Sequence, residues 1–287
     1  MASSQTRGEK AFRKLHGIFF LGTVLMLVSS CAEDVVTVDL KNVTPKIVIE
    51  GTISDQGEPC TVKITTTGDF YRPSDFPPVT GAAVILRDSA GNEEQLRETD
   101  PGLYRGASVP GVEGRSYTMT VTTGGKTFSA SSTIMKAVEI DSLSSHYETD
   151  PDIFNRDYEN KKAGYVFRCH FIDPEDTIDY YRIKIYLNSN LMDGIHLFND
   201  RHSNGKAIDY SFEHDYLFDL NDTLKVDLET LDKASYNYFS TLNDLLLGQG
   251  EDAMFSSVPD NPTSNLTNGA FGYFSAYAVR SKTIVFQ

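Results

Sequence analysis

One short segment contains four acidic residues whose side chains could bind a metal ion. Asp173, Glu175, Asp176 and Asp179 surround Pro174, and carboxylate oxygens are ligands that Ca²⁺ accepts. Their spacing lacks the central glycine of an EF-hand loop. We interpret the segment as a Pro-containing acidic turn. The sequence therefore predicts no metal site here.

Other groups with catalytic chemistry are scattered along the chain. The histidines lack zinc-binding spacing such as HExxH, and no GxSxG elbow, P-loop or GxGxxG motif is present. Asp200 to Gly205 is rich in functional groups, but its Asn-Gly pair is first of all a turn signal. We predict no catalytic residue, no metal ligand and no cofactor, and hence no enzymatic activity; a hydrolase using an acidic pair is the least favoured alternative. The histidines beyond the N-terminal segment are His146, His170, His196, His202 and His214.

Cys31 is the one residue to which we assign a chemical role. A basic segment is followed by an apolar run over residues 17–28, which is the anatomy of a secretory signal. The run is short for a membrane-spanning helix, which needs about 20 residues. Val28-Ser29-Ser30-Cys31 then resembles the bacterial lipobox. The resemblance implies that residues 1–30 are a lipoprotein signal peptide, and that Cys31 carries diacylglycerol and usually a third acyl chain, such as palmitate.

The residues after Cys31 bear on its destination. Ala32-Glu33-Asp34 resembles the acidic signal that sends Bacteroidota lipoproteins to the outer leaflet of the outer membrane. A solvated acidic linker is the alternative interpretation. We expect residues 31–44 to be the lipidated cysteine and its tether, and the protein to be anchored by lipid in the outer membrane, facing the cell exterior.

Charge excludes two kinds of partner. The chain of 287 residues has a formal charge of −14. Removal of residues 1–30 takes away four basic residues and one acidic residue, which leaves 257 residues with a charge of −17. Such a field repels the phosphate backbone of nucleic acids. A polybasic surface that docks on anionic lipid is likewise excluded.

The other two cysteines are expected to be structural. Cys60 and Cys169 each lie in an apolar, strand-like pattern. Free cysteine behaves as a small hydrophobic residue, so we predict two separate buried thiols. A disulfide between them is the alternative that spacing does not decide.

Strands dominate the part of the chain that must position any site. Residues 45–137 predict an N-terminal β-sandwich, of immunoglobulin-like or carboxypeptidase-regulatory-like type, with about seven short strands. The clearest signal is a hairpin in which Gly124-Gly125 joins the alternating segments 117–122 and 126–130.

Residues 138–287 predict a second β-rich domain with one helix. An acidic, irregular segment extends to about residue 162, and strands resume at 165–171, 180–187 and 223–228. Apolar residues recur at helical spacing over 232–247, and Gly248 follows. Two strands, 272–279 and 283–286, close the chain. The aromatic residues of this region are expected to pack in the core rather than form a binding platform; they are Tyr236, Tyr238, Phe239, Phe271, Tyr273, Phe274 and Tyr277.

Several short segments follow one another in a characteristic order. They are Ile49-Glu50-Gly51, Gly81-Ala82-Ala83-Val84, Gly102-Leu103-Tyr104, Gly114-Arg115-Ser116-Tyr117, the helix from Tyr236 to Leu246, and the closing segment from Asn265 to Phe274. In this order, behind a lipobox, they resemble the Bacteroidota outer-membrane lipoproteins of the domain of unknown function 4249 family. The resemblance covers nearly the whole mature chain.

The resemblance implies a function without implying any catalytic residue. Members are often encoded near TonB-dependent transporters, so we expect a lipid-anchored accessory or binding protein that acts as partner of such a β-barrel transporter in nutrient uptake. The alternative is a stand-alone surface protein that binds a glycan, a peptide or a metal chelate. No residue pattern selects a ligand-binding site.

Overall fold

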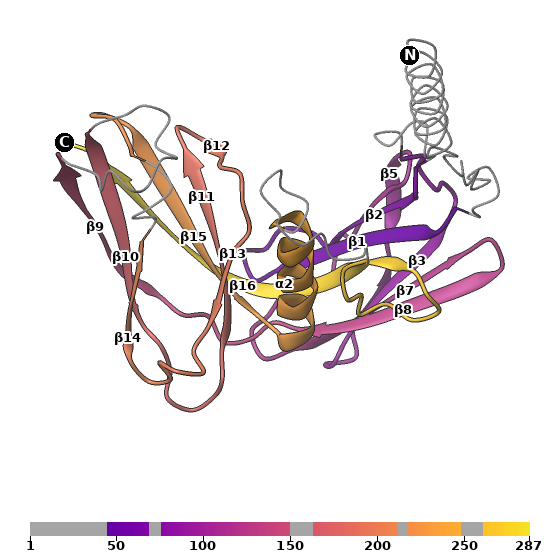
Figure 1. Ribbon diagram of the computed structural model, residues 1–287. Coiled ribbons are helices and arrows are strands. Elements are labelled where there is room, and N and C mark those ends of the chain that lie inside the picture. The colour runs from indigo at the N-terminus through magenta and orange to yellow at the C-terminus, as the bar shows by residue number, and fades with distance from the viewer. Residues whose placement is uncertain (1–44, 69–75, 150–162, 212–216, 248–260) are drawn as a thin grey trace, which may run out of the picture. The chain divides into compact units, whose positions relative to one another are not determined.

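The computed structural model describes residues 45–68, 76–149, 163–211, 217–247 and 261–287 (Figure 1). These residues form a mainly β structure with one helix among them, as the sequence predicted. The predicted signal peptide, Cys31 and the tether lie outside the described residues, and so does His214.

The first hydrophobic core lies between two layers of strands. β1 (Ile47–Ser54) pairs with β2 (Thr61–Thr66), which continues to β6 (Leu103–Arg105) and β5 (Arg97–Asp100). The facing sheet has the order β4 (Glu93–Gln95), β3 (Ala83–Asp88), β7 (Ser116–Thr123) and β8 (Lys126–Thr133). Alternate side chains are buried in β1 of one sheet and in β3 and β7 of the other, as period-two patterning requires. A β-sandwich results, which is the architecture predicted for this half.

The predicted hairpin forms between β7 and β8. Thr123 pairs with Lys126, so Gly124 and Gly125 alone make the turn. Both glycines have positive φ angles, of 56° and 72°. Tight turns of this kind require such angles, which explains why the Gly-Gly pair identified the hairpin from sequence.

The second core also lies between two layers. One is a three-stranded sheet of β14 (Ala207–Ser211), β10 (Gly164–Ile172) and β9 (Ile140–Glu148). The other contains β11 (Tyr180–Leu187), which pairs with β12 (Asn190–Leu191), β13 (His196–Asn199) and β15 (Thr223–Leu231). The prediction of an irregular segment up to residue 162 was wrong for β9: this polar strand is specified by its pairing with β10, which a local pattern does not reveal.

One long strand takes part in the layers around both cores. β16 (Phe271–Val285) pairs with β1 in parallel through its first half and with β15 in antiparallel through its second half (Figure 1). The sequence predicted two strands here instead of one. The chain passes from the first core to the second near residue 138, but five residues of the C-terminal segment belong to the first core: Leu266, Ala270, Phe274, Ala276 and Ala278.

The parallel pairing of β1 and β16 depends on Gly272. This residue has a φ angle of 93°, a conformation that side chains rarely adopt. A Cβ atom at this position would collide with the backbone carbonyl of Ile49. Glycine is therefore the residue that allows the closing strand to approach β1.

The helix α2 (Lys233–Leu247) is fixed to the first sandwich at its N-terminus. Asp232 Oδ1 accepts a hydrogen bond of 2.7 Å from the Ser235 amide, which is the N-cap arrangement. The other carboxylate oxygen accepts bonds from the Ser132 hydroxyl at 2.7 Å and the Thr133 amide at 3.0 Å, both on β8. The Ser132 hydroxyl oxygen accepts in turn from the Ala276 amide of β16. One aspartate thus joins α2 to the first core.

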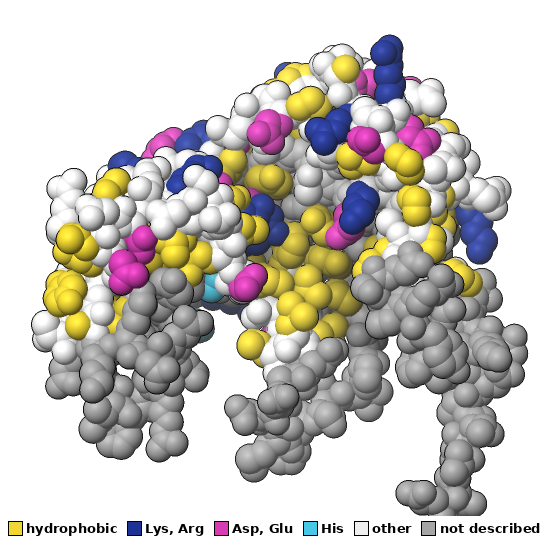
Figure 2. Space-filling view, turned by 90° about the horizontal axis from the view of Figure 1, so that it is seen from above, with side chains coloured by type: hydrophobic (Ala, Val, Ile, Leu, Met, Phe, Trp, Pro, Cys, Tyr) yellow, Lys and Arg dark blue, Asp and Glu magenta, His cyan; other side chains and the backbone are white. Residues whose placement is uncertain are grey.

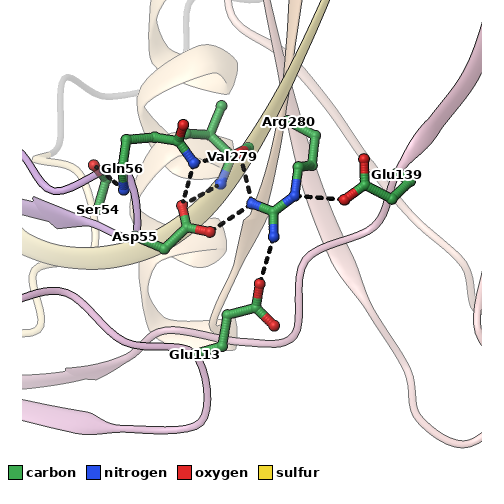
Figure 3. A network of polar contacts seen from close by, with 7 residues as sticks. All are labelled: Ser54, Asp55, Gln56, Glu113, Glu139, Val279 and Arg280. Atoms are coloured by element: carbon green, nitrogen blue, oxygen red, sulfur yellow. Dashed lines mark hydrogen bonds and ion pairs between the residues drawn. The ribbon is translucent and has the colours of Figure 1, made fainter.

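A second polar junction is centred on Arg280 of β16 (Figure 3). Its guanidinium donates to Asp55 after β1 at 2.5 Å, and to Glu113 and Glu139 at 2.6 Å each. Asp55 also accepts a bond from the Val279 amide. Segments from both halves of the chain therefore converge on one arginine, whose planar group suits several carboxylates at once.

Candidate functional site

The two described cysteines are buried and free. Cys60 lies in the first core and Cys169 in the second. Burial raises the pKa of each thiol to about 12. Such thiols stay protonated at neutral pH and are poor nucleophiles. The prediction of two separate buried thiols is confirmed.

Two of the described histidines, His146 and His170, make local contacts at strand surfaces. His170 Nε2 lies 2.7 Å from the Ser144 hydroxyl on the neighbouring strand, and Nδ1 contacts Asp209 on the other side. His146 lies 3.8 Å from Glu148. Within the described residues, the side chains gathered with metal-ligand spacing are aspartates and include no histidine.

The aromatic residues of α2 and β16 pack against one another. Tyr238, Phe239 and Tyr273 form one cluster, with ring centroids 4.7 to 5.3 Å apart. Phe274 is fully buried in the first core. These residues hold the helix on the sheet, which agrees with the predicted core packing.

Three aspartates from separate segments meet at one end of the second core. Asp173 follows β10, Asp179 precedes β11, and Asp200 follows β13. Because Tyr180 pairs with Asn199, the next step of the ladder brings Asp179 opposite Asp200, and the Asp200 amide lies 3.3 Å from the Asp179 carbonyl. We call Asp173, Asp179 and Asp200 the aspartate cluster.

The members of the aspartate cluster are buried and differ in their partners. Their exposed fractions are 1%, 6% and 0% in chain order. Asp173 accepts from the Tyr181 hydroxyl at 2.5 Å and from the Gly205 amide at 2.9 Å. The Thr177 hydroxyl lies 3.1 Å from both carboxylate oxygens of Asp179. Neither carboxylate oxygen of Asp200 has a hydrogen-bond partner among the described residues.

Burial dominates the electrostatics of the aspartate cluster. It raises the pKa of Asp200, and the neighbouring Asp173 raises it further. Burial likewise raises the pKa of Asp179, with added repulsion from Asp173 and Asp200. Among the described residues no lysine, arginine or histidine forms an ion pair with any of the three. The cluster therefore concentrates negative charge that the described part of the protein does not balance.

The sequence indicates two members of this cluster and gives no sign of the third. The acidic turn was recognised, and it supplies Asp173 and Asp179, while Glu175 and Asp176 are exposed. Asp200 was assigned to a turn, and the loop does contain hydrogen-bonded turns at Asp200 to Lys206. The pairing of β11 with β13 is the signal that joins the two segments. A short strand of mixed residues gives little indication of that pairing.

A small cleft lies between α2 and the strands β11, β12 and β13, which belong to one nine-stranded sheet together with β15, β16, β1, β2, β6 and β5. It has a volume of about 150 Å³, below the roughly 300 to 1,000 Å³ typical of small-molecule pockets. Arg182 lines it and forms a buried ion pair with Glu229, its cross-strand neighbour. The guanidinium also lies 3.9 Å from the centre of the Phe239 ring. The charged side chain of Arg182 is thus already paired within the protein.

Apolar side chains continue outward from this cleft. Leu191 and Leu242 line it, and Leu246 lies one helical turn beyond Leu242. Leu191 is 57% exposed and Leu246 is 56% exposed. We call Leu191, Leu242 and Leu246 the α2–β12 surface. Figure 2 shows one face of the molecule on which hydrophobic side chains gather in a hollow bordered by charged ones.

No helix in the described parts of the chain is both long and apolar enough to cross a membrane. Comparison with curated proteins gives no match. The sequence model of one family, described as Domain of unknown function (DUF4249), matches residues 33–283. This match covers most of the chain, including the first core, the aspartate cluster and most of the closing strand. The chain belongs to the DUF4249 family.

Proposed function

We propose that this protein is a non-enzymatic, lipid-anchored accessory or binding protein at the outer surface of the outer membrane, and a partner of a TonB-dependent transporter in nutrient uptake. The observation that carries the proposal is Val28-Ser29-Ser30-Cys31 behind a basic and then apolar segment. Several acyl chains at Cys31 provide stable anchoring, because each buried methylene contributes about 0.8 kcal/mol and one chain alone binds only marginally.

The position at which the family match begins supports a mature chain that starts at Cys31. The match begins at residue 33, two residues after Cys31. The segment from Cys31 to Pro45 can span at most about 50 Å when fully extended. A folded unit beginning at Pro45 would therefore stay within reach of the membrane surface and of a membrane protein beside it.

The α2–β12 surface supports the role as a partner. Leu191 and Leu246 place large apolar side chains in water beside an apolar cleft. Contiguous exposed apolar side chains commonly mark protein interaction sites. Burial of a leucine side chain contributes about 1.5 to 3 kcal/mol, so a partner that covers both residues would gain substantially. We assign this surface to contact with the transporter.

Affinity purification tests the proposal. The tagged full-length lipoprotein, extracted from its own cells in mild detergent, is expected to bring down a β-barrel identified by mass spectrometry as a TonB-dependent transporter. Recovery of the protein alone would contradict the partnership and favour the stand-alone binding protein.

Paired variants test the assigned surface. Leu191→Asp with Leu246→Asp should remove the transporter from the purified material, because the charges would have to be buried without partners. Leu220→Asp is the matched control: Leu220 is 60% exposed and precedes β15, and it is not one of the residues that line the cleft. Equal recovery of the transporter with the double variant and with the control variant would refute the assignment of this surface.

A further inference from the structure

We propose that Asp173, Asp179 and Asp200 bind one Ca²⁺ ion, which ties the turn between β10 and β11 to the loop after β13. This site is separate from the α2–β12 surface. It does not depend on the proposed transport partnership.

The separation of the carboxylate oxygens fits a shared cation. One oxygen from each aspartate lies within 4.8 Å of the others. Two oxygens that bind the same Ca²⁺ at about 2.4 Å cannot be more than about 4.8 Å apart. The observed distances therefore satisfy the limit set by coordination.

Asp200 supplies independent support for a missing partner. The residue is 0% exposed, yet neither carboxylate oxygen accepts a hydrogen bond from the described residues. A buried carboxylate without a partner is costly, because it loses its hydration and gains nothing in return. A cation between Asp200 and the other two aspartates would give the Asp200 carboxylate a partner.

Backbone contacts hold the two segments in place around the cluster. The Asp173 amide donates to the Lys206 carbonyl at 3.0 Å, while the Gly205 amide donates to the Asp173 carboxylate. The Ser203 amide donates to the Asp200 carbonyl at 2.7 Å. The loop after β13 is thus folded back onto the turn, and the carboxylates converge without any rearrangement.

The ligand type selects the class of cation. Three carboxylates and no sulfur or imidazole favour a hard ion over zinc or copper. Mg²⁺ keeps several waters and is usually held by one or two carboxylates, whereas Ca²⁺ accepts more protein oxygens in irregular geometry. A cage of three carboxylates therefore favours Ca²⁺. A proton shared between Asp173 and Asp200 is the competing way to neutralise the cluster.

Calcium titration of the full-length lipoprotein, stripped with a chelator and kept in detergent, tests the proposal. Isothermal titration calorimetry should give one site, and the thermal midpoint should rise with Ca²⁺ concentration. Terbium, which substitutes for Ca²⁺, should show luminescence excited through tyrosine, because the Tyr181 hydroxyl contacts Asp173. Tyr181→Phe should lose most of that luminescence and keep Ca²⁺ binding.

Two variants separate the cation from the shared proton. Asp200→Asn should lower Ca²⁺ affinity by at least about tenfold, because the charge of the ligand set controls affinity. It should also remove the calcium-dependent rise in the thermal midpoint. Asp176→Asn, an exposed residue of the same turn, should bind as the unaltered protein does. Asp179→Asn provides a second test if Asp200→Asn does not fold.

Absence of heat, of luminescence and of any calcium-dependent change in the thermal midpoint would overturn the proposal in favour of the shared proton. Binding that survives in both Asp200→Asn and Asp179→Asn would overturn it as well, since the ion would then lie elsewhere.

Discussion

Replacing Asp232 with alanine tests how the helix is joined to the first sandwich. The substitution removes the N-cap bond to the Ser235 amide and the bonds from Ser132 and Thr133 of β8. Loss of an N-cap costs about 1 kcal/mol. A buried donor left without an acceptor costs about 1 to 3 kcal/mol, and Ser132 is only 3% exposed. We therefore expect the free energy of unfolding to fall by about 3 kcal/mol.

Thermal unfolding followed by far-ultraviolet circular dichroism measures this loss. For a domain of this size 1 kcal/mol corresponds to roughly 2 to 4 °C, so the midpoint should fall by about 6 to 12 °C. Asp232→Asn keeps an oxygen for capping and should lose less. Asp244→Ala is the matched control, because Asp244 is an exposed aspartate of the same helix and such changes usually stay within about 0.5 kcal/mol. Equal midpoints for Asp232→Ala and Asp244→Ala would refute the junction as described.

Three further predictions concern the rest of the fold. Arg280→Lys should lower the thermal midpoint by several degrees, because a lysine cannot bond three carboxylates in one plane; an unchanged midpoint would show that the network contributes no stability. Burial acts to raise the pKa of Asp88, but hydrogen bonds from Asn92 and Arg115 outweigh it and hold the pKa below its ordinary value. The stabilisation from Asp88 is thus complete above about pH 4 and is lost as the pH falls through the lowered pKa. Asp88→Asn, which cannot titrate, should flatten this part of a stability curve measured from pH 6 to 2, and an identical curve would contradict the assignment. Gly272→Ala should prevent folding or lower the free energy of unfolding by more than about 3 kcal/mol, whereas Gly269→Ala, with open space around its Cβ, should cost only about 1 kcal/mol; the two would be compared by expression as soluble protein and by thermal unfolding.

Local signals identified the helix and the hairpin because the residues that specify them are close in sequence. Asp232 caps the helix that follows it, and Gly124-Gly125 makes its own turn. β16 shows the opposite case. Its pairing with β1, which begins where Val48 lies opposite Phe271, joins residues that are far apart in sequence. From the sequence alone, the polar residues near Ser281 indicate the end of one strand and the start of another. Antiparallel pairing with β15 carries the strand through these residues.

The aspartate cluster shows the same division between local and distant information. Asp173 and Asp179 share one turn and were recognised together. Asp200 joins them only because β13 pairs with β11, and four residues of half-buried strand carry no clear period. Burial of Asp200 is a tertiary property, and so is the lack of a partner for its carboxylate.

Intact mass spectrometry of the purified protein tests the proposed lipid anchoring most directly. We predict a chain of 257 residues that begins at Cys31 and carries a diacylglycerol with or without an additional acyl chain. Its Cys31→Ala variant provides the control and should show no lipid mass. A chain that begins at another residue and has no lipid mass would contradict the proposal.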